Sequence, residues 1–141
     1  MNPLAELQTI VDSGLFVLIW LVQLVIYPSF AVIEEGHFHS WHTRFSAMIS
    51  LVVTPLMVIQ VGIEAVVMIN EIRWWRISLI ALIWLATFFL SVPCHRRLHT
   101  RGKDARMIRW LVLTNWIRTM GWSLLFWQTA AEVLARSPFF Q

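Results

Sequence analysis

The feature that most constrains this chain is a set of four long apolar stretches separated by short polar segments. The stretches cover residues 15–33, 45–69, 74–92 and 108–134, and each has about 17 or more residues, enough for a helix to cross a bilayer core about 30 Å thick. Only 13% of the residues are charged, against about 25% in a typical soluble domain. The pattern predicts an all-α protein, an integral membrane four-helix up-and-down bundle, with residues 1–141 forming one domain.

The ends of the predicted helices indicate how the bundle would be oriented in a membrane. An up-and-down order places both termini and the Asn70–Glu71 turn at one end, named side A, and the 34–42 and 94–106 loops at the other, named side B. The positive-inside rule assigns the more basic side to the cytoplasm. We therefore expect a bacterial inner-membrane protein with side B cytoplasmic and the termini periplasmic. Side B has seven basic residues and side A three: Arg44, Arg96, Arg97, Arg101, Lys103, Arg106 and Arg109 against Arg73, Arg76 and Arg136.

The start of the chain, its cysteine content and its charge further restrict the class of protein to which the chain can belong. No basic segment precedes an apolar run at the start, so a cleaved signal peptide is not expected. Cys94 is the only cysteine, which excludes an internal disulfide. The net charge of +3 does not indicate nucleic-acid binding, because the basic residues lie at helix ends, where they meet the headgroups of membrane lipids.

All five histidines belong to the two side-B loops or to the helix ends beside them: His37, His39, His42, His95 and His99. If helical order begins near Phe38, His39 and His42 are three residues apart on one face, and His95 and His99 are four apart on another. Two neighbouring antiparallel helices would then direct three or four imidazoles into one volume.

Neutral imidazole is a common ligand of zinc, copper, iron and haem iron. The histidine pattern predicts a metal ion (iron, copper or zinc) or a haem, held by His39, His42, His95 and His99. His42 and His95 are the firmest candidates, because each lies closest to an apolar helical core. The alternative is that these side chains are structural, or handle protons, without a bound metal.

A second polar set lies deeper, in the fourth apolar stretch. Asn115 and Arg118 are three residues apart and share a helix face. A charged group near mid-bilayer costs at least about 2.5–3.5 kcal/mol, so Arg118 should face the bundle interior and have partners. Helical rise favours Gln60 as its direct partner, with an ion pair to Glu64 through a water or a tilt. The set is either a structural clasp between helices or a binding site for an anion or substrate.

Two prolines within apolar stretches support a cavity beside this set. Pro28 and Pro55 each interrupt the backbone hydrogen-bond ladder, which kinks a helix and opens space in a bundle. Tyr27 is the only tyrosine and lies toward side B. Its phenol would either donate a hydrogen bond to a substrate or anchor the helix at the membrane interface.

Several of these short motifs together resemble one family. Tyr27-Pro28, the Val92-Pro93-Cys-His-Arg-Arg-Leu98 segment, and Trp110 followed by Asn115 and Arg118 resemble the anthrone-oxygenase-like family of small four-helix membrane proteins. The order of these elements agrees over most of the chain, although His95 replaces an asparagine of the family pattern. The resemblance implies a membrane oxygenase or oxidoreductase acting on an aromatic or otherwise lipophilic molecule.

The sequence supports three interpretations of function. The first is a redox enzyme with a histidine-bound metal or haem near the cytoplasmic face, in which Arg118, Asn115 and Tyr27 act on a lipophilic small-molecule substrate. The second is a non-enzymatic bundle, an accessory or assembly subunit of a larger membrane complex. The third is a small transporter using Glu64 and Arg118, which would need to oligomerise because no inverted repeat is visible. A homo-oligomer fits any of them.

Overall fold

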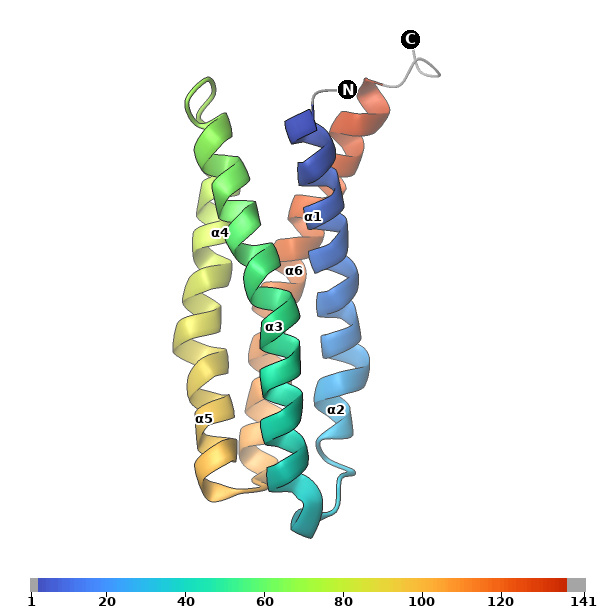
Figure 1. The fold of residues 1–141 in the computed structure, drawn as a ribbon, viewed down its shortest axis with the longest axis vertical. Helices are drawn as coiled ribbons and strands as arrows, with labels where there is room; N and C mark the ends of the chain where they lie inside the picture. The colour runs from blue at the N-terminus through green and yellow to red at the C-terminus, as the bar shows by residue number, and fades with distance from the viewer. Residues whose placement is uncertain (1–2, 137–141) are drawn as a thin grey trace.

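The computed structural model describes residues 3–136 and contains four long helical rods (Figure 1). The rods, in chain order, are α1 (Pro3–Leu21) with η1 (Val22–Ile26) and α2 (Tyr27–Ser29); α3 (Glu35–Val67); α4 (Trp74–Ala86) with η2 (Thr87–Ser91) and α5 (Val92–Arg101); and α6 (Ala105–Ala135). Successive rods run in opposite directions, so the start of α1, the end of α6 and the α3–α4 turn lie at one end (Figure 1). The predicted all-α, four-helix architecture is confirmed, and the chain threads up and down.

Three of the rods, within residues 3–136, are long and apolar enough to span a membrane: Pro3–Ser29, Glu35–Val67 and Trp74–Arg101. The fourth, α6, has 31 residues but carries Asn115 and Arg118 in its middle, which lowers its mean hydropathy. Large apolar side chains are exposed on the outer faces, for example Leu51 at 70% and Phe89 at 71%. Three such helices and an apolar exterior indicate an integral membrane protein.

The helices extend beyond the apolar stretches at side B. α3 begins at Glu35, earlier than the expected Phe38, and α5 continues to Arg101, so the final turn covers only residues 102–104. Gly102 has a φ of 79°, a conformation that favours glycine and ends α5. The Asp104 carboxylate caps α6 by accepting from the backbone N–H groups of Arg106 and Met107. The hydrogen bond from Met107 lowers the pKa of Asp104.

Two short π-helical segments interrupt the first and third rods just before proline residues. Pro28 and Pro93 lack an N–H, and their rings would clash with the carbonyl four residues earlier in a regular helix. The backbone forms a wider, π-helical turn instead, in which the N–H of Tyr27 bonds to the carbonyl of Val22, five residues back. Such wide turns shift the following residues around the helix and occur frequently at functional sites. Here Tyr27 and Cys94, which follow the two segments, are buried in the bundle.

A buried charged network joins all four rods in the half of the bundle near side A. Arg76, which is fully buried, donates to Asp12 at 2.7 Å and to Glu64 at 2.5 Å. Arg73 also donates to Glu64, at 2.8 Å. Gln60 donates to the other oxygen of Asp12, at 2.7 Å. The expectation that Gln60 or Glu64 would bind Arg118 is therefore wrong, because both side chains are engaged in this separate network, and Arg73 and Arg76 are not free interfacial charges.

A glycine allows the close approach of α4 and α6. A Cβ atom added at Gly121 would lie 2.8 Å from Ile83 Cγ1, closer than real contacts allow. We expect Gly121→Leu to lower the thermal midpoint markedly, since overpacking a tight contact costs about 1–3 kcal/mol. Gly62→Ala is the matched control, because nothing lies within 4 Å of its added Cβ. Thermal unfolding in detergent compares the two, and equal midpoints would show that the Gly121 contact is not tight.

Candidate functional site

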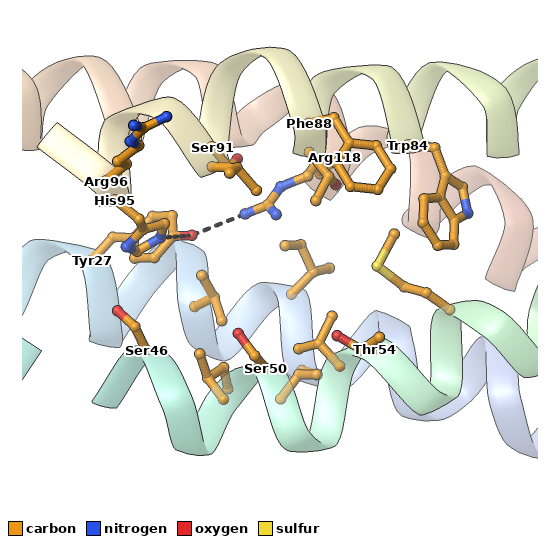
Figure 2. Close-up of a pocket in the computed structure, with 18 of the residues that line it drawn as sticks. Tyr27, Ser46, Ser50, Thr54, Trp84, Phe88, Ser91, His95, Arg96 and Arg118 are labelled. Atoms are coloured by element: carbon orange, nitrogen blue, oxygen red, sulfur yellow. Dashed lines mark hydrogen bonds between the residues drawn. The ribbon is translucent and has the colours of Figure 1, made fainter. Parts of the chain in front are cut away.

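An elongated cavity of about 540 Å³ lies between α3 and the third rod, with contributions from α1 and α6 (Figure 2). Its walls are largely apolar, and Leu18, Ile19, Val22, Val53 and Met57 are among the lining residues. Ser46, Ser50 and Thr54 lie one helical turn apart on α3 and face the cavity (Figure 2). Such a cavity, apolar with a few convergent polar groups, is typical of a small-molecule site.

A chain of four polar side chains forms one wall of this cavity near side B. Arg118 Nη2 donates to the Tyr27 hydroxyl at 3.0 Å, and that hydroxyl lies 3.0 Å from His95 Nε2 (Figure 2). His95 Nδ1 is in turn 3.0 Å from His42 Nε2. The four residues, named here the relay, come from four different rods. Tyr27, His42 and Arg118 are all buried.

One arrangement of the hydrogens lets each group of the relay donate to the next, from Arg118 to His42. A guanidinium only donates, so the Tyr27 oxygen accepts from Arg118 and its own hydrogen is free to donate to His95 Nε2. A neutral His95 then carries its hydrogen on Nδ1 and donates to His42 Nε2. His42 consequently carries its hydrogen on Nδ1, an atom that is buried and has no partner among the described residues. A bound molecule or a water that accepts this bond would complete the chain.

Asn115 holds the other side of the Arg118 guanidinium. Its Oδ1 accepts from Arg118 Nε at 2.9 Å and also from Nη2. Its Nδ2 donates to Gln23 Oε1 at 2.8 Å, and Thr119 donates to the same oxygen at 3.1 Å. The predicted Asn115–Arg118 face is thus present, with Tyr27 and Gln23 as its partners instead of Gln60 and Glu64.

Arg118 has no carboxylate partner among residues 3–136. The salt bridges of residues 3–136 engage Arg73, Arg76 and His37, and none includes Arg118. Its exposed fraction is only 7%, and the guanidinium projects into the cavity (Figure 2). A nearly buried cation without a counter-ion is unfavourable unless a ligand or solvent compensates it.

Aromatic rings close the side-B end of the relay. Phe38 stacks on the His42 ring with centroids 5.5 Å apart, and Phe30 makes an edge contact with the same ring at 5.6 Å. Both phenylalanines are fully buried. Tyr27 is packed inside the bundle as well, with an exposed fraction of 4%, so the structure contradicts its interpretation as an interfacial anchor.

The five histidines separate into groups instead of forming one cluster. His39 and His99 stack on each other at the surface with centroids 5.0 Å apart, and His99 Nδ1 lies 2.9 Å from the Thr43 hydroxyl. His37 is exposed and pairs with Glu34. Among residues 3–136, no group of three or more His, Cys, Asp or Glu side chains is arranged to hold a metal ion.

The contact between His42 and His95 also does not suit an ion or a haem iron bound between their facing nitrogens. Those nitrogens are 3.0 Å apart. Two imidazoles on opposite sides of one metal, each about 2.0–2.1 Å from it, require a separation of about 4 Å. The arrangement instead suits a direct hydrogen bond. The metal or haem at His39, His42, His95 and His99 remains a prediction.

Sequence reasoning identified the relay residues but missed the polar strip on α3. Ser46, Ser50 and Thr54 recur every four residues in an apolar stretch, which is the spacing of one helix face. That spacing predicts that the three hydroxyl side chains lie on one face of the helix, directed toward the bundle interior. Asp12 was missed as well, although an acidic residue in an apolar helix indicates a buried partner.

Comparison with known proteins returned no match among protein-family models, curated proteins or solved structures.

Proposed function

We propose that this protein is an integral membrane enzyme of the oxidoreductase or oxygenase type that binds a lipophilic small molecule in the cavity and acts on a polar group of that molecule. The observation that carries the proposal is the relay of Arg118, Tyr27, His95 and His42 along an otherwise apolar cavity. A purely structural bundle has no need for an open cavity beside such a chain. We expect that end, with the relay, to face the cytoplasm, because side B has the excess of basic residues.

The cavity lies where a molecule dissolved in the bilayer would reach it. α3 packs on α1 and, near side B, on α5, whereas α4 packs chiefly on α6. The space between α3 and the α4–η2 part of the third rod is therefore occupied mainly by the cavity (Figure 2). Phe88 lines this space and is 53% exposed, so the lining continues to the outer surface that faces lipid.

The relay supplies positioning and proton transfer. Arg118 would hold an oxygen of the bound molecule and stabilise negative charge that develops on it or on the Tyr27 oxygen. Tyr27 can pass its proton to His95 Nε2, while His95 passes the proton on Nδ1 to His42, because each donor and acceptor is already within 3.0 Å. Phe30 and Phe38 cover the His42 end of this path.

A cavity-filling variant tests whether the cavity is occupied. We expect Ser50→Trp to remove most of any lipophilic compound that co-purifies with the protein, because the indole would enter the cavity. Leu51→Trp is the matched control, since Leu51 points outward on the same helix and is 70% exposed. Mass spectrometry of solvent extracts gives the amount of compound per protein. Equal amounts in both variants would contradict a ligand-binding cavity and favour an accessory role in a larger membrane complex.

The predicted metal or haem has an independent test. Elemental analysis and an optical spectrum of the detergent-purified protein report any bound iron, copper, zinc or haem. A metal content that falls in both His42→Ala and His95→Ala would establish these residues as ligands. A content unchanged in both would restrict the histidines to the relay.

A further inference from the structure

The buried charges of this protein balance in one half of the bundle and not in the other. Near side A, two arginines and two carboxylates lie together: Arg73 and Arg76 with Asp12 and Glu64. The formal charge of that network is zero. In the half that contains the cavity, Arg118 is a buried cation for which residues 3–136 provide no carboxylate partner.

Arg118 also has unused hydrogen-bonding capacity on the cavity side. Its Nε and Nη2 donate to Asn115 and Tyr27. Its Nη1 makes no hydrogen bond within residues 3–136, and the guanidinium lies in the middle of the cavity view (Figure 2). Two N–H donors and a full positive charge are thus directed toward space that a ligand can occupy, with the Ser50 hydroxyl on the opposite wall (Figure 2).

The cavity is long. Its lining on α3 runs from His42 to Met57, which is roughly 20 Å by helical rise. That length accommodates an extended apolar chain lying beside α3.

We propose that the cavity binds an amphiphile whose anionic oxygen group pairs with Arg118 and whose apolar body lies along α3 toward Met57. This inference rests on the proposed function of the cavity and specifies its ligand. A carboxylate, phenolate or enolate supplies the missing counter-charge and accepts the free Nη1 hydrogens. A charged hydrogen bond of this kind, from Nη1 to an anionic oxygen, is roughly twice as strong as one between neutral groups.

Three probes with the same twelve-carbon chain separate charge from hydrophobicity: dodecanoate, dodecanol and dodecylammonium. Binding to the wild-type protein in detergent is measured by calorimetry at mildly alkaline pH, where the carboxylic acid is ionised. We expect dodecanoate to bind about tenfold or more tightly than dodecanol, because it gains charged hydrogen bonds that the alcohol lacks. Dodecylammonium should bind most weakly, since like charges repel at Arg118.

Variants confirm where the selectivity arises. Arg118→Gln keeps a polar group that can reach Tyr27 and should bind both dodecanoate and dodecanol with similar affinity. Arg118→Lys keeps the charge and should retain part of the preference for dodecanoate over dodecanol. A retained preference would show that a substitution at this position does not by itself unfold the protein. Ser50→Trp should weaken all three probes, whereas Leu51→Trp should not.

The outcomes distinguish this inference from the proposed function. Equal wild-type affinity for dodecanoate and dodecanol, with both lost in Ser50→Trp, would overturn the anionic ligand and leave the lipophile-binding cavity in place. No binding of any probe would contradict both. An ultraviolet tyrosinate signal from Tyr27, the only tyrosine, in the ligand-free protein at neutral pH would also overturn the inference, because Tyr27 would then supply the counter-charge itself.

Discussion

Arg76→Met is expected to lower the free energy of unfolding by about 3–5 kcal/mol, because removing one partner of a buried ion pair leaves the other uncompensated. Arg76 is fully buried and donates to Asp12 and Glu64, at 2.7 Å and 2.5 Å. Methionine keeps a long apolar side chain but leaves Asp12 without its cation. Thermal or denaturant unfolding in detergent, followed by circular dichroism, gives the change.

Two further variants make this expectation specific to the buried network. Arg109→Met removes an exposed arginine at side B and should change stability by no more than about 0.5 kcal/mol. The double variant Asp12→Leu with Arg76→Met removes both charges of one pair and should be more stable than Arg76→Met alone. Arg76→Met and Arg109→Met proteins that unfold at the same midpoint would show that the network contributes little.

Asn115→Leu is expected to cost about 2–3 kcal/mol of stability and to weaken ligand binding. Asn115 is fully buried and its Oδ1 is the acceptor for two nitrogens of Arg118. Leucine has a similar size but leaves a buried guanidinium with one fewer partner, which carries a desolvation cost. The guanidinium would also lose the contact that aims it at the cavity.

Thr114→Val is the matched control for Asn115→Leu. The Thr114 hydroxyl bonds only to carbonyls of its own helix, those of Trp110 and Leu111, so its loss should have little effect. Unfolding midpoints and dodecanoate affinity are measured for both variants. If Asn115→Leu matched Thr114→Val in both measurements, Asn115 would have no role in holding Arg118.

The fold could be predicted from the sequence because it depends on length and hydropathy. Four apolar stretches joined by short loops leave few arrangements other than an antiparallel bundle, and that threading brings Tyr27, His42 and His95 to one end. The sequence therefore predicted correctly which end of the bundle holds the histidines, and that Arg118 faces its interior.

The contacts within the site were not predictable in the same way, because they depend on the rotation of each rod. Helical rise placed Gln60 near Arg118, but Gln60 is turned toward Asp12. The π-helical segment before Pro28 shifts the face on which Tyr27 lies, and the 3.6-residue period contains no signal for this shift. The separation of His39 and His99 from His42 and His95 also depends on how each helix is rotated about its axis. Residues three or four apart lie on the same side of a helix but point in somewhat different directions.

The central claim, that the cavity takes up a lipophilic molecule from the bilayer, is tested most directly by photolabelling. The protein in vesicles is exposed to a long-chain carboxylic acid bearing a diazirine, irradiated, and digested for mass spectrometry. We expect adducts on cavity residues such as Val53, Met57 and Trp84, suppressed by excess unlabelled dodecanoate. Adducts confined to outward residues such as Leu51 and Leu113, and insensitive to the competitor, would contradict the claim.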